Sequence, residues 1–81
     1  MSKIHIYIDT IYKFQIEIDV LMTDSIEYVK SLIQDKIGVH PDCQYLYYND
    51  KYIDDNNKCI YDYNIQNNSV MTQKLYISEY P

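Results

Sequence analysis

Apolar and polar residues alternate with a period of two over two stretches near the start of the chain. Every second residue is isoleucine in residues 4–8, and a second series of alternate apolar residues begins at Phe14 and ends at Val20. This period is typical of a strand that buries one face. Because only a short turn over residues 9–13 separates the two stretches, we expect an antiparallel hairpin. The turn contains no glycine, so its type stays open.

The period changes to that of an amphipathic helix in the segment TDSIEYVKSLIQDKIG. Apolar residues at three- and four-residue spacing define its buried face: Ile26, Val29 and Ile33. Asp24 or Ser25 can accept hydrogen bonds from the free N–H groups of the first turn. Gly38 is the single glycine of the chain, and it predicts the end of the helix through a left-handed residue.

Shorter elements follow the helix. The segment QYLYY predicts a third strand, Asn49 and Asp50 predict a turn, and residues around Ile53 predict a very short fourth strand. The polar segment CIYDYNIQNNS is expected to form a turn or a 3₁₀ segment. Its two inward anchors are Ile60 and Ile65.

The last strand, VMTQKLYI, contains a conflict. Met71, Leu75 and Ile77 are expected to face inward, but the same alternation places Gln73 among them. A buried glutamine does not fit a half-buried strand, so we expect a bulge or a slip of register to repair the pattern.

The order of elements defines the fold class. Strand, strand, helix, strand, short strand and strand predict an α+β domain with one helix across one face of a mixed sheet of four to five strands. A chain of 81 residues has room for one domain, 1–81, and 13 isoleucines with 11 tyrosines supply its compact core. This apolar content excludes the disordered class.

Charge and hydropathy exclude several partners. The net charge is −5, with seven lysines and no arginine, so the basic surface that phosphate contacts require is missing and no nucleic acid is expected. No apolar run approaches the roughly 20 residues that cross a bilayer, and the first residues lack a secretory signal. We therefore expect no membrane partner and a cytoplasmic or nuclear location, in which Cys43 and Cys59 stay free thiols.

Candidate chemistry is sparse. His40, Cys43 and Cys59 are zinc-ligand types without the paired spacing of structural sites, so neither metal nor cofactor is expected. The carboxylates are scattered over loops and outward strand positions: Asp9, Glu17, Asp19, Asp54 and Asp55. His5 is expected to be an ordinary solvated residue. Without a cleft for a Cys–His pair or an acid/base pair, we expect no catalytic residues and no enzyme.

Four segments resemble the ubiquitin family, in the same order and at nearly the same spacing: DSIEYVK, IQDKIG, PDCQYLYY and DYNIQ. The similarity covers essentially the whole chain, with one extra residue in the DDNN loop. It implies the β-grasp fold. It also implies that the Tyr63 hydroxyl ties its loop to the backbone near Asp54, and that Ile65 belongs to the core.

The resemblance also bears on conjugation, which in this family requires a flexible tail ending in Gly-Gly. The aligned positions hold Glu79 and Tyr80, and Pro81 follows. A bulky aromatic side chain followed by proline does not thread the narrow sites that accept glycine. The resemblance therefore implies a protein that is not itself conjugated by the usual chemistry.

The hydrophobic patch of the family aligns with altered residues, of which only Ile11 keeps an aliphatic side chain. Tyr45 and Tyr47 alternate with Leu46, so they should point away from the core and share a face with the last strand. The expected partner-binding residues are Ile11, Tyr45, Tyr47, Thr72, Lys74 and Tyr76. Tyrosine is enriched at interfaces. Strand propensity and an AT-rich genome offer a simpler explanation of the tyrosines.

The expected function is that of a monomeric interaction module. Its partner would be a protein, such as a ubiquitin-binding domain or a ubiquitin-handling enzyme, and its role that of a mimic or decoy in ubiquitin recognition. The alternative is a divergent modifier or chain acceptor. Lys51 aligns with a linkage lysine of the family, and Lys30 and Lys36 align with two others, although Lys30 is expected to be partly packed.

Overall fold

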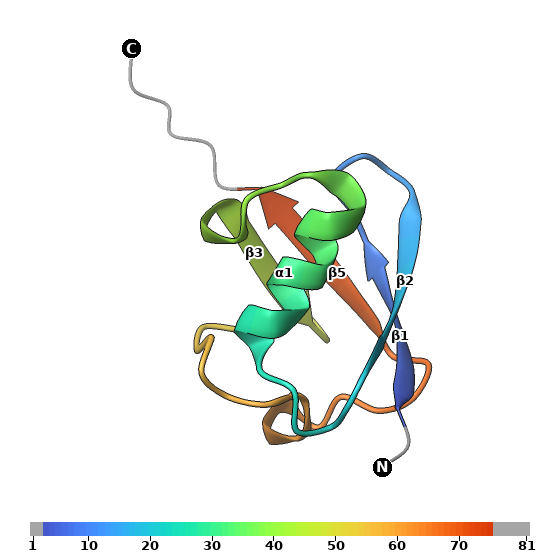
Figure 1. Cartoon of the computed structure of the whole chain (residues 1–81), viewed down its shortest axis with the longest axis vertical. Coiled ribbons are helices and arrows are strands. Elements are labelled where there is room, and N and C mark those ends of the chain that lie inside the picture. The colour runs from blue at the N-terminus through green and yellow to red at the C-terminus, as the bar shows by residue number, and fades with distance from the viewer. Residues whose placement is uncertain (1–2, 76–81) are drawn as a thin grey trace.

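The computed structural model describes residues 3–75, which form one sheet with a single α-helix lying across one face (Figure 1). The elements are β1 (Ile4–Asp9), β2 (Gln15–Val20), α1 (Ile26–Ile37), β3 (Gln44–Tyr48), β4 (Lys51–Tyr52) and β5 (Val70–Leu75), with 3₁₀ turns η1 (Pro41–Cys43) and η2 (Ile60–Tyr63). The strand order is β2-β1-β5-β3-β4. Only β1 and β5 run parallel among these neighbours, which confirms the expected mixed β-grasp sheet.

The β1–β2 hairpin is confirmed, but its turn is longer than the alternation predicts. Strand β2 begins at Gln15, and Phe14 is 51% exposed. The Phe14 carbonyl accepts hydrogen bonds from the N–H and hydroxyl of Thr10, and these bonds hold Phe14 in the turn. The expectation that Phe14 faces inward is therefore wrong. Lys13 has a φ of 64° and occupies the left-handed position that glycine favours in such turns.

Helix α1 begins and ends at the residues that the sequence indicates. The Ser25 hydroxyl accepts a hydrogen bond from the N–H of Tyr28 at 3.1 Å, whereas the carboxylate of Asp24 accepts one from the N–H of Leu21 at 2.8 Å. Ser25 is therefore the N-cap. Gly38 has a φ of 78°, and its N–H donates to the Gln34 carbonyl at 2.7 Å, which closes the helix.

The core lies between α1 and the sheet. It is made almost entirely of aliphatic side chains that are nearly or fully buried: Ile6, Ile8, Ile18, Val20, Ile26, Val29, Ile33, Leu46, Ile53, Ile60, Ile65 and Met71. Ile60 and Ile65 are the anchors that the sequence predicts, and η2 is the expected 3₁₀ segment. Burying these side chains supplies the main driving force for folding.

The segments before and after β4 are held by a tight two-residue turn and by hydrogen bonds of Tyr63, respectively. Asn49 and Asp50 have φ values of 52° and 63°, as in the two-residue turns that match the twist of a hairpin. The Tyr63 hydroxyl accepts a hydrogen bond from the N–H of Asp55 at 3.2 Å and donates one to the carbonyl of the same residue at 3.4 Å. The tie expected near Asp54 is thus present one residue further along the chain.

Strand β5 pairs without interruption on both sides, so the expected bulge or register slip is wrong for the described residues. Its pairing with β3 runs from Gln44 opposite Leu75 to Tyr47 opposite Thr72. Gln73 lies opposite Leu46 and points into the core, where it is only 3% exposed. Ile77, also expected to face inward, lies outside the described residues.

Candidate functional site

The candidate site is the open face of the sheet, on the side away from α1. Leu46 is fully buried, so Tyr45 and Tyr47 on either side of it in β3 point away from the core. Tyr45 lies opposite Lys74, and Tyr47 lies opposite Thr72. The structure therefore brings four of the six expected residues together on one face.

Tyr47 is at the centre of a cluster of contacts on this face. The Lys74 ammonium lies 4.8 Å from the centre of the Tyr47 ring, within the range of a cation–π contact. The Tyr52 ring lies 5.5 Å from that of Tyr47 and 5.6 Å from that of Tyr45. These contacts join β3, β4 and β5 into a continuous aromatic surface with one cation on it.

Tyr52 is not among the residues that the sequence predicts for this face. Its place follows from the register of the β3–β4 hairpin, in which Tyr47 pairs with Tyr52. The two-residue turn at Asn49 and Asp50 fixes that register, because it makes Tyr48 and Lys51 the last pair before the turn. A type I′ assignment for this dipeptide would have predicted the contact from sequence.

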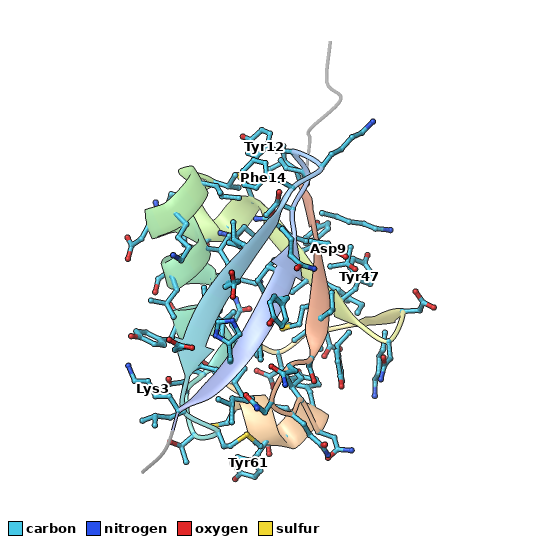
Figure 2. The ribbon with its side chains drawn as sticks, turned by 90° about the vertical axis from the view of Figure 1, so that its right-hand side faces the viewer. Lys3, Asp9, Tyr12, Phe14, Tyr47 and Tyr61 are labelled. Atoms are coloured by element: carbon cyan, nitrogen blue, oxygen red, sulfur yellow. The ribbon has the colours of Figure 1, made fainter. Side chains whose placement is uncertain are left out.

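The other two expected residues are placed differently. Ile11 lies half-buried in the β1–β2 turn, where its N–H donates a long hydrogen bond to the Gln73 side chain at 3.5 Å. Its neighbours Tyr12 and Phe14 stack with ring centres 6.1 Å apart, and both are exposed at one end of the molecule (Figure 2). Tyr76 lies outside the described residues.

The β1–β2 half of the open face carries a charged cluster that the sequence does not predict. His5 Nδ1 lies 2.7 Å from the Asp19 carboxylate, and Nε2 lies 2.5 Å from the Glu17 carboxylate. The side-chain hydrogen bond to Asp19, followed by the one to Glu17, raises the pKa of His5 above its ordinary value of 6.5. His5 is solvent-accessible, as expected, but it contacts two carboxylates, because pairing of β1 with β2 sets His5 directly opposite Asp19.

This cluster predicts a pH dependence of stability. A raised pKa in the folded state means that His5 contributes stability fully below about pH 6.5, and that the contribution is lost as the pH rises through the folded-state pKa. The difference in unfolding free energy between wild type and His5→Gln should therefore be larger near about pH 5.5 than near about pH 8.5. Urea denaturation at the two pH values measures it.

A proton NMR titration of the His5 ring gives the independent check. Asp19→Asn should lower the pKa of His5 relative to wild type, because the largest stabilising hydrogen bond to the cation is weakened. A wild-type His5 that titrates at or below 6.5 would contradict the role assigned to the two carboxylates.

The three lysines that align with linkage lysines of the family, Lys30, Lys36 and Lys51, differ in their exposure to solvent. Lys51 is exposed in β4 and borders a pocket of about 430 Å³, whose other lining residues are Tyr48, Asn49, Tyr63, Asn64 and Gln66. Lys30, expected to be partly packed, is buried, and this burial lowers the pKa of its ammonium group. Lys36 is exposed near the end of α1. Lys51 and Lys36 are thus the accessible members of this set.

The candidate zinc ligands are not gathered into a site. Cys43 and Cys59 are both free thiols. Within residues 3–75, no group of three or more His, Cys, Asp or Glu side chains is arranged to hold a metal ion. The helices in this same part of the chain are too short or too polar for any of them to cross a membrane.

A mixed five-stranded sheet, one helix across one face and an open face of exposed side chains define a β-grasp domain. A family model described as "Ubiquitin family" matches residues 6–75. The chain therefore belongs to the ubiquitin family, as its four segments of resemblance indicate. Domains of this family generally mediate protein interactions and are generally not enzymes.

Proposed function

We propose that this chain is a non-enzymatic, monomeric interaction module of one domain, 1–81, which acts in the cytoplasm or nucleus as a mimic or decoy in ubiquitin recognition. The surface assigned to the partner is the tyrosine face, defined as Tyr45, Tyr47, Tyr52, Thr72 and Lys74. One observation carries the proposal: Tyr47 is held in contact with both Tyr52 and Lys74 on the open face. Aromatic side chains clustered in this way are typical of the energetic centres of interfaces.

The sequence supports a role that does not depend on conjugation. Glu79 and Tyr80 occupy the positions that align with the Gly-Gly of the family. Gly38 is the only glycine in the 81 residues, and its left-handed φ serves to end α1. A protein that keeps the fold but holds other residues at these two positions can occupy a ubiquitin receptor without entering the conjugation reaction. That property is what a decoy requires.

The test is a titration of isotope-labelled protein with a panel of ubiquitin-binding domains and deubiquitinases. We expect amide shifts centred on Tyr47 and Tyr52, and Tyr47→Ala should weaken binding at least about tenfold, as for a residue near the centre of an interface. Tyr52→Ala should act in the same direction. The matched control is Tyr28→Ala, because Tyr28 lies on α1, away from the open face, and is 45% exposed against 42% for Tyr52.

Two outcomes would overturn the proposal. Silence across the whole panel would remove the proteins of the ubiquitin system as partners. Binding that is equally sensitive to Tyr47→Ala and Tyr28→Ala would remove the tyrosine face. Thermal unfolding of each variant establishes that the loss of binding does not reflect loss of the fold.

A second candidate function is that of a chain acceptor through Lys51. It is favoured by the exposure of Lys51 beside the pocket bordered by Tyr63. Incubation with activating, conjugating and ligating enzymes and ubiquitin should then add the mass of ubiquitin to wild type. Lys51→Arg should abolish the addition, whereas Lys36→Arg should not. An unchanged mass under conditions that modify a control substrate would exclude this function.

A further inference from the structure

The β1–β2 half of the open face carries negative charge beside the tyrosine face. Side chains on the outer side of β1 and β2 provide three carboxylates: Asp9, Glu17 and Asp19. Asp9 is the one closest in register to the tyrosines, because Asp9 pairs with Thr72 and Thr72 pairs with Tyr47. Figure 2 shows Asp9 and Tyr47 on this same side of the molecule, with β5 between them.

Asp9 also differs from the other two carboxylates in its neighbours. Glu17 and Asp19 both contact the His5 ring. The Asp9 carboxylate accepts a hydrogen bond from the Gln15 amide at 2.9 Å, and no lysine or histidine in residues 3–75 lies within ion-pair distance of it. Lys74, the lysine on the tyrosine face, lies over the Tyr47 ring. An exposed negative charge therefore borders the aromatic surface without a compensating cation in the described part of the chain.

We infer that Asp9 and the tyrosine face form one docking surface for a cationic amphipathic helix of a partner protein. An arginine of that helix contacts Asp9, and an aliphatic residue covers Tyr47 and Tyr52. The inference rests on the proposed function and names the chemistry of the partner. Arginine is the better match, because its guanidinium can bind a carboxylate through two hydrogen bonds and can also stack on a tyrosine ring.

The spacing of the strands sets the spacing of the two anchors. Asp9 and Tyr47 are separated by β5, so their strands lie two sheet spacings apart, about 9.6 Å. Residues seven apart on one side of a helix are separated by about 10.5 Å along its axis. A helix that crosses the strands with leucine over Tyr47 and arginine seven residues later therefore reaches both anchors.

Charge argues against a second copy of this chain as the occupant. The net charge of the chain is −5, so two copies repel each other. A cationic partner instead gains attraction at Asp9, and that attraction weakens as salt screens it.

The test uses two synthetic helical peptides that share their leucines and differ at one position. This position lies seven residues after the central leucine, and it holds arginine in one peptide and glutamate in the other. The arginine peptide should shift the amide signals of Asp9, Tyr47 and Tyr52, and the glutamate peptide should bind at least about tenfold more weakly. Asp9→Asn should weaken the arginine peptide about fivefold or more, and raising the salt concentration should reduce that difference.

The matched control is Asp35→Asn, which removes an exposed carboxylate from α1 and should leave the affinity unchanged. Equal binding of the two peptides, equal effects of Asp9→Asn and Asp35→Asn, or no binding of either peptide would each overturn the inference. The inference would also be overturned if analytical ultracentrifugation showed that the wild type is a dimer and that Tyr47→Ala is a monomer. If the panel proteins still lose affinity on Tyr47→Ala while Asp9→Asn is silent, this inference fails and the proposed function stands.

Discussion

Replacing Gln44 by leucine is expected to lower the free energy of unfolding by about 2 to 3 kcal/mol. Gln44 is the first residue of β3 and is 1% exposed. Its side-chain amide donates hydrogen bonds to the carbonyls of Lys30 at 2.9 Å and Val39 at 3.0 Å. Leucine has a similar volume but no donor, so both buried carbonyls lose this partner and the contact between α1, the segment after it and the sheet is weakened.

Denaturation with urea measures this change as a shift of the midpoint at constant slope. Gln66→Leu is the matched control, because Gln66 is exposed and the same change of side chain there should alter stability by less than about 0.5 kcal/mol. Indistinguishable midpoints for the two variants would show that the amide of Gln44 does not hold the helix to the sheet.

The same substitution at Gln73 is expected to have the opposite sign, raising the free energy of unfolding by about 2 kcal/mol. Gln73 is also buried, but its Nε2 has no hydrogen-bond partner among residues 3–75, and its Oε1 accepts only the long hydrogen bond from the N–H of Ile11 at 3.5 Å. Leucine removes the cost of the unpaired donor and adds apolar contact beside Leu46, its cross-strand neighbour.

A double variant tests whether the two glutamines act independently. Gln44 Oε1 is also buried and unpaired within residues 3–75, and Gln44 and Gln73 are diagonal neighbours on the inner side of β3 and β5. Additive effects to within about 0.5 kcal/mol are expected if the two amides do not interact. A destabilising Gln73→Leu together with strong coupling would instead show that Gln44 accepts a hydrogen bond from Gln73.

Gln73 also shows where prediction from sequence fails. Alternation located β1 and β2 because each of these strands buries one face, strand propensity located β3, and Gly38 marked the end of α1 because its φ suits the left-handed region. Treating polar residues as outward residues gave the wrong answer at Gln73, since pairing of β5 with both β1 and β3 fixes its register regardless of one side chain. Phe14 is the converse case, an apolar side chain in an exposed turn.

The candidate site was predictable only in part, for a related reason. The outward direction of Tyr45 and Tyr47 follows from alternation within one strand. The contacts of Tyr52 with them, and of His5 with Asp19, depend on which residues lie opposite each other in neighbouring strands. That register is set by the lengths of the turns, and the β1–β2 turn, with Lys13 in place of a glycine, carries no strong sequence signal.

The scarcity of glycine has a consequence for the turn between β3 and β4. Asn49 and Asp50 adopt left-handed conformations that cost L-residues more than glycine, so the folded turn bears some backbone strain. The compensation lies in the unfolded chain, which has fewer conformations to lose than one with glycines at these positions. The hairpin is correspondingly stiff, and it holds Tyr47 and Tyr52 together before any partner arrives. A preorganised surface of this kind gives up less conformational entropy on association.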